Sequence, residues 1–410
     1  MDCFNHPEWT KDKNIYEVNL RQYTEEGTIK AFMEHLPRLK SMGVDILWLM
    51  PIHPVGEKNR KGTLGSQYAA KDYMGLDPSL GEKSDLKILV DKVHEMGMYL
   101  IIDWVANHTG WDNVWVDEHP DWYQRNEQGE LFPYTYVDSK KTEYWTDVIG
   151  LNYENQDLWQ GMTDAMAYWV REFDIDGFRC DVAGLVPTPF WEFATEQLHQ
   201  IKHLFMLAEW SAPDLHDKAF DMTYDWGFYE LMGEIVKGDK SVSDIPKYLD
   251  SLFSEYPKDA YRMVFTTNHD KNSWEASDEE YFGKAFKAFS VLAATLYGMP
   301  LIYSGQESYL DKRVEFFEKD SINWKEFELQ SFYTELLKLK HENPALWNGT
   351  YGAMPVFRDT ENPYVISFVR EKENNSVEVT INLSGETQQY KTLHSNAEAN
   401  LEPYQYVINS

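Results

Sequence analysis

The sequence predicts an α/β protein built on a closed (β/α)8 barrel, and three observations support that prediction. Short apolar runs with the composition of buried strands alternate with longer helical patterns, and eight such runs occur. Polar and acidic residues directly follow several of these runs. In a parallel barrel the C-terminal ends of the strands carry the functional loops, so these residues lie where a site is expected. No G-x-G-x-x-G turn follows the first run, which disfavours an open doubly wound sheet, the alternative architecture.

Glycines and prolines mark the ends of the expected elements. The run at residues 46–50 stops at Pro51, and the helical pattern before it, at 28–42, stops at Gly43. A second helical pattern stops at Gly97, just before another run. The eight expected strands lie at residues 15–20, 46–50, 99–103, 177–181, 203–208, 220–224, 263–267 and 301–304, with helical patterns at 28–42, 84–97 and 281–297 among them.

Two further segments do not fit the strand–helix alternation. About fifty residues rich in Trp, Asp, Pro and Gly separate the third expected strand from the next helix, and such a length indicates a small inserted domain. After Pro344 the helical pattern stops, and residues 364–370 and 377–383 alternate like strands. We therefore expect a barrel with a short insertion after strand three and a small C-terminal β-sandwich-like domain. The expected boundaries are 1–108 and 157–348 for the barrel, 109–156 for the insertion and 349–410 for the β domain.

Composition excludes several classes of partner. A formal net charge of −30 argues against nucleic acid, whose phosphates are neutralised by Lys and Arg, and against anionic membranes. No apolar run approaches the roughly 20 residues of a membrane span. The first residues lack the basic and apolar regions of a signal peptide, so we expect a cytoplasmic protein, or a periplasmic or secreted one whose leader has been removed. Two cysteines, Cys3 and Cys180, give no disulfide framework, and the oligomeric state stays open.

Carboxylates gather where the expected strands end. Asp103 ends the third strand, Asp181 the fourth, and Glu209 and Asp270 follow the fifth and seventh. Since these ends meet at one mouth of a barrel, the carboxylates should converge. Paired carboxylates suit glycoside cleavage, in which one attacks the anomeric carbon and a second, protonated group donates to the leaving oxygen. An aromatic content of 15%, with 15 Trp and 26 Tyr, also suits sugar rings, whose apolar faces stack on aromatic side chains.

The motifs at these ends resemble the four short conserved regions of the α-amylase family of glycoside hydrolases. They read Asp103-x-x-x-Asn107-His108, Gly177-Phe178-Arg179-x-Asp181, Glu209, and Asn268-His269-Asp270, in the family's order. The resemblance covers about residues 10–345. It implies a retaining hydrolase of α-1,4-glucosidic bonds in starch, maltodextrin or maltooligosaccharides.

The resemblance also implies a role for each matching residue. Asp181 is similar to the nucleophile, Glu209 to the acid/base and Asp270 to the carboxylate that stabilises the distorted sugar. Arg179 points to the same side of its strand as Asp181 and should keep it ionised. The remaining expected substrate-binding residues are the stacking tyrosine Tyr68, the hydroxyl-binding His108 and His269, the supporting Asp103, and Trp210, which we expect to desolvate Glu209.

Two departures from the family pattern concern the metal and the linkage. The better-known amylases carry a His shortly after the nucleophile that serves calcium, whereas Val182-Ala183-Gly184 follows Asp181 here. Calcium is therefore left unassigned, with Asn107 as the one candidate ligand, and no organic cofactor is expected. Val182 occurs in family members that act on α-1,6 bonds, which keeps an α-1,6-glucosidase or an α-glucan transglycosylase as the alternative.

Two alternatives from other classes are less consistent with the motifs. A non-catalytic sugar-binding or partner subunit would lack the carboxylates, and this chain has them all. A metal-dependent barrel hydrolase would need a His-x-His pair on the first strand, and none occurs there.

Overall fold

Eight parallel strands close into a barrel in the computed structural model, which describes residues 5–137, 141–392 and 398–410. The strands follow the order β1-β11-β10-β9-β8-β7-β3-β2, and pairing of β1 with β11 completes the circle. This confirms the predicted barrel and excludes the open sheet. The strands are β1 (Ile15–Val18), β2 (Ile46–Leu49), β3 (Tyr99–Trp104), β7 (Gly177–Cys180), β8 (Phe205–Ala208), β9 (Met222–Tyr224), β10 (Tyr261–Val264) and β11 (Met299–Tyr303).

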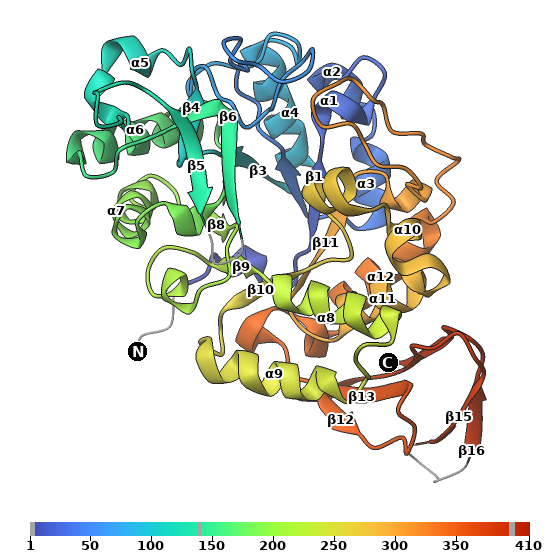
Figure 1. The fold of residues 1–410 in the computed structure, drawn as a ribbon. Helices are drawn as coiled ribbons and strands as arrows, with labels where there is room; N and C mark the ends of the chain where they lie inside the picture. Colours follow the sequence, from blue (N-terminus) through green and yellow to red (C-terminus); the bar gives the residue numbers. More distant parts are fainter. Residues whose placement is uncertain (1–4, 138–140, 393–397) are drawn as a thin grey trace.

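Helices surround the barrel, as Figure 1 shows. The longer ones are α4 (Lys83–Glu95), α6 (Gln156–Phe173), α7 (Thr188–His199), α8 (Trp226–Lys237), α9 (Asp244–Glu255), α11 (Phe286–Thr295) and α12 (Gln330–Glu342). Two expected helices are each broken in two. The first is α2 (Ile29–Met33) and α3 (Leu36–Met42), because Pro37 cannot donate in a helix interior and instead sits in the first turn of α3. The second is α10 (Asp278–Phe282) and α11, separated at Gly283, whose φ is +52°.

Side chains of the strands alternate between the barrel interior and the helix layer. On β7, Phe178 and Cys180 pack in the core shared with the helices, while Arg179 lies fully buried on the other side. Cys180 therefore faces the helix layer, whereas Cys3 lies outside the described residues. Gly177 begins this strand because a Cβ there would lie 1.9 Å from the carbonyl oxygen of Phe205 on β8.

The two segments that interrupt the alternation form antiparallel sheets. The insertion contains α5 (Trp115–Glu118) and a three-stranded sheet of order β4-β6-β5, from β4 (His108–Gly110), β6 (Thr142–Gly150) and β5 (Pro133–Val137). The C-terminal part has a four-stranded sheet of β12 (Val356–Arg358), β13 (Val365–Lys372), β14 (Asn375–Asn382) and β17 (Tyr406–Asn409), and a two-stranded antiparallel sheet of β15 (Gln388–Lys391) and β16 (Glu398–Leu401). In Figure 1 this red part lies beside α11 and α12. No helix in the described part of the chain is long and apolar enough to cross a membrane.

Candidate active site

Arg179 is the centre of the group of polar residues at the ends of the barrel strands. Its Nη1 donates to both carboxylate oxygens of Asp103, at 3.0 and 3.2 Å, and to Oδ1 of Asp181 at 3.0 Å. Its Nη2 lies 3.0 Å from Oε1 of Glu209, an ion pair that is not aligned as a hydrogen bond. One guanidinium group thus brings together three predicted residues from β3, β7 and β8.

Aromatic rings enclose this guanidinium group. Its carbon lies 4.9 Å from the ring centre of Trp48, 5.6 Å from that of Tyr224 and 5.7 Å from that of Tyr68. Nε of Arg179 donates to the Tyr224 hydroxyl at 3.1 Å, and Nε1 of Trp48 donates to Oδ2 of Asp103 at 3.1 Å. Trp48 and Tyr224 were not predicted. Their signal in the sequence is a polar-tipped aromatic residue inside an apolar strand.

Burial and mutual repulsion raise the pKa of the central carboxyls. Burial is the largest cause of the raised pKa of Asp181, and the charge of Glu209 adds to it. Burial also raises the pKa of Glu209, and it raises that of Asp103 to about 6. Arg179 lowers the pKa of all three carboxyls, but burial outweighs it. The pKa of Asp181 stays well above its usual value, so the expectation that Arg179 keeps Asp181 ionised is not met by that charge alone. The cluster is therefore able to hold a proton close to neutral pH.

Val182 holds Glu209 from the neighbouring loop. Its backbone N–H donates to Oε2 of Glu209 at 2.7 Å. Its φ of +37° and ψ of 46° lie in the left-handed region, a strained conformation for a β-branched residue. Trp210 packs over the same loop, since a Cβ at Gly184 would lie 2.2 Å from its indole ring. Burial of Glu209 acts in the expected direction, and the share of Trp210 in that burial stays a prediction.

A second chain of contacts links the barrel's first strand to the same cluster. Nδ1 of His269 lies 2.5 Å from Oε1 of Glu17, and its Nε2 lies 2.8 Å from the Tyr68 hydroxyl. Burial lowers the pKa of His269, but Asp270 and Glu17 outweigh it and raise that pKa to about 9. Both ring nitrogens therefore carry protons at neutral pH. The Tyr68 hydroxyl accepts a hydrogen bond from Nε2 and donates one to Oδ2 of Asp103, at 3.1 Å.

Glu17 was not predicted as a site residue, although one signal points to it. It is a fully buried carboxylate inside the otherwise apolar strand β1. A buried carboxylate needs a partner, and the sequence does not show which one. The partner, His269, is 252 positions away.

Asp270 lies at the open side of the cluster. Its side chain is 35% exposed, and Oδ2 lies 3.4 Å from Nε2 of His269. It immediately precedes a π-helical turn, Lys271–Glu275, a rare conformation that is frequent at functional sites. Among the predicted carboxylates, Asp270 is therefore the one most open to a ligand.

His108 is the first residue of strand β4 of the inserted sheet, and Asn107 directly precedes it. Burial lowers the pKa of His108 to about 4, so the ring is neutral, and Nδ2 of Asn107 donates to its Nδ1 at 3.1 Å. The ring packs against Tyr134 and Trp145 of the insertion. Asn107 offers one side-chain oxygen, whereas calcium takes six to eight oxygen ligands. Within residues 5–137, 141–392 and 398–410, no group of three or more His, Cys, Asp or Glu side chains could hold a metal ion.

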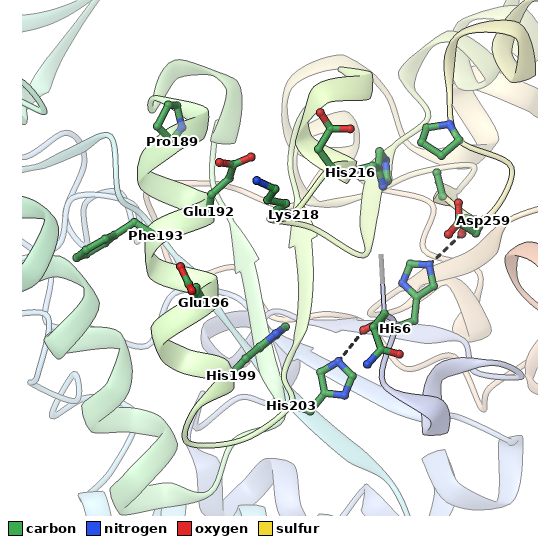
Figure 2. A pocket seen from close by; sticks show the side chains of 14 residues that line it. His6, Pro189, Glu192, Phe193, Glu196, His199, His203, His216, Lys218 and Asp259 are labelled. Carbon is green, nitrogen blue, oxygen red and sulfur yellow. Dashed lines mark hydrogen bonds between the residues drawn. The ribbon is translucent and has the colours of Figure 1, made fainter. Parts of the chain in front are cut away.

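A broad hollow of about 1270 Å³ lies away from this cluster, between α7 and the N-terminal segment. Figure 2 shows several histidines around it. Nε2 of His203 lies 2.7 Å from the Asn5 carbonyl oxygen, and Nδ1 of His6 lies 2.8 Å from Oδ1 of Asp221. These rings hold neighbouring segments together, and none of the predicted site residues lines the hollow.

Comparisons with known proteins agree with this architecture. Residues 7–331 match the family model of the α-amylase catalytic domain. The chain is 27% identical to the α-amylase MalA of Haloarcula japonica, covering 93% of this chain and 57% of that protein, so it spans little more than half of that relative. It is 26% identical to a cyclomaltodextrinase of a Bacillus species, covering 93% of this chain and 74% of the other. It is 27% identical to an α-1,4-glucan:maltose-1-phosphate maltosyltransferase of Picrophilus torridus, covering 92% and 61%.

Solved structures extend the similarity to the C-terminal sheets. The crystal structure of an α-amylase from Lactobacillus plantarum superposes with a TM-score of 0.85 at 30% identity, covering 98% of this chain and 99% of the other. That of the maltogenic α-amylase AmyB from Thermotoga neapolitana gives 0.82 at 30% identity, covering 98% and 96%.

Proposed function

The chain belongs to the α-amylase family of glycoside hydrolases, and on that premise we propose that it hydrolyses α-1,4-glucosidic bonds of maltooligosaccharides or longer α-glucans with retention. One observation carries the proposal: Asp181 and Glu209 both lie 3.0 Å from nitrogens of the Arg179 guanidinium group. A shared guanidinium limits the separation of the two carboxyls. Retaining glycosidases place theirs roughly 5–5.5 Å apart.

The contacts of the two carboxyls support different roles for them. Asp181 accepts a well-aligned hydrogen bond from Arg179, which favours its ionised form. Oε2 of Glu209 accepts from the Val182 N–H, while Oε1 faces the guanidinium group without that alignment, which stabilises its ionised form less. We therefore assign the nucleophile to Asp181 and the acid/base to Glu209.

The proposed reaction has two displacements. Asp181 attacks the anomeric carbon while Glu209 gives its proton to the leaving oxygen, so a glycosyl ester forms as the glucosidic bond breaks. Glu209, now ionised, takes a proton from water, which attacks the same carbon and releases Asp181. Because each displacement inverts the carbon, the product retains its α-configuration.

The surrounding residues bind and stabilise the sugar in this proposal. Asp270 accepts hydrogen bonds from sugar hydroxyls and faces the positive charge that develops on the ring. His269 is protonated below about pH 9, and its Nε2 donates to a sugar oxygen when the sugar replaces the Tyr68 hydroxyl as its hydrogen-bond partner. The Tyr68 ring stacks against the sugar's apolar face. The two displacements use no organic cofactor.

Replacement of the proposed nucleophile tests the function. Asp181→Asn keeps the side chain's size but cannot form the ester, so turnover of maltoheptaose should fall by roughly 10⁴-fold or more. The matched control is Asp250→Asn, an exposed position on α9. Near-wild-type activity in Asp181→Asn would remove the assignment, provided that circular dichroism shows both variants folded.

The stereochemistry and the linkage are tested on the wild type. Proton NMR of fresh product should show the α-anomer first, and an initial β-anomer would contradict retention. Rates on maltotriose, pullulan and isomaltose, with analysis for lengthened products, separate α-1,4 hydrolysis from α-1,6 cleavage and from transfer.

A further inference from the structure

An exposed aromatic group lies next to the proposed site and takes no part in the reaction described above. It consists of Trp274, Phe316 and Phe317, here called the outer platform. Trp274 is 54% exposed, and the two phenylalanines are partly buried. A large apolar side chain this exposed contributes little to the core, so its position in an aromatic group at the mouth of a site points to a ligand.

The outer platform continues the aromatic surface of the site. The rings of Tyr68 and Phe316 are nearly parallel, with an interplanar angle of 14° and centres 6.1 Å apart. Trp274 follows, with its ring centre 5.0 Å from that of Phe316 and 5.7 Å from that of Phe317. Tyr68 is in turn stacked at 14° on His269, beside the carboxylates. A row of rings therefore leads from the proposed reaction centre to the surface.

Buried hydrogen bonds hold the two segments of the outer platform together. Trp274 belongs to the π-helical turn after Asp270, whereas Phe316 belongs to the loop after β11. Asn272, only 1% exposed, donates to the Lys312 carbonyl at 3.0 Å and accepts from the Val314 N–H at 2.9 Å. The Ser273 hydroxyl donates to the Val314 carbonyl at 2.8 Å.

The far side of the loop is anchored as well. The Leu64 N–H donates to the Phe317 carbonyl at 3.0 Å, and Nη1 of Arg21 donates to the Phe316 carbonyl at 3.3 Å. The rings are thus presented by a braced loop, which lowers the entropy lost when a ligand binds.

We propose that the outer platform binds glucose units of the α-glucan chain beyond those held at the carboxylates, and so favours longer chains. This inference rests on the proposed function. A glucan is the occupant that fits, because its rings have apolar faces for stacking and it extends from a bond held beside Tyr68. A chain with a net charge of −30 disfavours an anionic ligand at the same surface.

Substrate length is the variable that tests the proposal. Trp274→Ala should lower kcat/KM on maltoheptaose about tenfold, the scale of losing one well-used aromatic contact. On maltotriose, which when bound across the carboxylates leaves at most two glucose units on the side of the platform, the loss should be clearly smaller than on maltoheptaose. Trp274→Tyr keeps a stacking ring and should restore most of the loss. Tyr364→Ala, which removes an aromatic residue that is 53% exposed near β13, is the matched control and should change neither rate.

Two results would overturn the inference: equal losses on both substrates, which would assign Trp274 to the architecture of the site, or no loss on either. Calorimetry of maltoheptaose binding to Asp181→Asn, with and without Trp274→Ala, separates this inference from the function. If the wild-type protein shows no hydrolysis, and Trp274→Ala nevertheless weakens maltoheptaose binding, the proposed function is wrong and the proposal for the outer platform is supported. If the wild-type protein hydrolyses maltoheptaose but Trp274→Ala leaves binding unchanged, the proposed function is supported and the proposal for the outer platform is wrong.

Discussion

Arg179 carries a permanent charge into the interior of the barrel, where its side chain is fully buried. Such a charge is tolerated only when its donors are paired, and Asp103, Asp181 and Tyr224 accept from it with good geometry. The same contacts lower the pKa of the two carboxyls against the effect of their burial. At the scale of single residues, one side chain therefore serves both the packing of the barrel and the charge balance of the site.

Glu17 offers a residue-scale prediction that concerns His269. Its charge is one of the two that raise the pKa of His269 to about 9 against burial. Glu17→Gln removes that charge while keeping the side chain's shape, and should lower this pKa by at least about one unit. NMR titration of ¹³C-labelled histidine rings measures it directly.

The sign of the accompanying stability change follows from the raised pKa. His269 binds its proton more tightly in the folded state, so its contribution is fully present below about pH 6.5 and is lost as the pH rises toward about 9. In Glu17→Gln this loss should still begin near pH 6.5 but should be smaller and end at a lower pH. The exposed Glu25→Gln is the control, and an unchanged His269 titration in Glu17→Gln would contradict the coupling.

At the scale of elements, short turns rather than helices place the site residues. The π-helical turn after β10 holds Trp274 next to the loop that follows β11, and the left-handed turn at Val182 directs a backbone donor toward Glu209. Both turns depend on partners from another part of the chain. The strained backbone of Val182 and the rare π-helical turn are tolerated because hydrogen bonds to those partners stabilise both conformations.

A pH-dependent stability prediction arises where α10 meets the loop after β11. Asp278 begins α10 and accepts from Nε2 of Gln306 at 2.8 Å, while its Oδ1 is buried without a described partner. Burial raises the pKa of Asp278 to about 7. The folded state therefore keeps a proton that the unfolded chain has released, and stability decreases as the pH rises from about 4 to about 7.

Asp278→Asn removes this titration without changing the side chain's size. The free energy of unfolding should increase by roughly 2–4 kcal/mol at pH 8, at about 1.4 kcal/mol for each unit of pKa difference, and should not increase below pH 4. Urea unfolding at both values measures it. The exposed Asp157→Asn, in the first turn of α6, is the control, and a gain of the same size at both pH values would refute the explanation.

At the scale of the whole molecule, a buried arginine joins the C-terminal sheet to the barrel. Arg370 on β13 donates to the carbonyl oxygens of Thr295, Trp347 and Ala353, at 3.1, 3.2 and 2.6 Å. Thr295 ends α11, where helix carbonyls lack partners within the helix. Burial lowers the pKa of Arg370 to about 9.

Loss of this contact should weaken the whole fold and not the C-terminal sheet alone. Arg370→Met leaves three carbonyls without a donor and should lower the free energy of unfolding by about 2–3 kcal/mol. Arg358→Met on β12, at an exposed position, is the control and should change it by less than about 0.5 kcal/mol. Calorimetry should show one transition at lower temperature in Arg370→Met, and an early separate transition of the sheet would contradict this view of the molecule.

Local signals predicted the barrel and the position of its polar residues. Apolar runs of four to six residues, several of them following a helical pattern that ends at Gly, indicated all eight strands, because strand burial and turn geometry are properties of neighbouring residues. The motifs around Asp103, Asp181, Glu209 and His269 likewise follow directly on those runs. Where the prediction was wrong, at Pro37 and Gly283, a single residue interrupted an otherwise continuous helical pattern.

Contacts between distant parts of the chain could not be predicted in this way. Glu17 meets His269 across 252 positions, and Phe316 reaches Tyr68 from a loop whose sequence has no periodicity. The positive φ of Val182 is equally hidden, because a β-branched residue in isolation disfavours it. The order of residues thus determined which carboxylates and strands this protein has. The closure of the barrel determined their partners, their pKa values and the rings beside them, because burial and charge act through space and not along the chain.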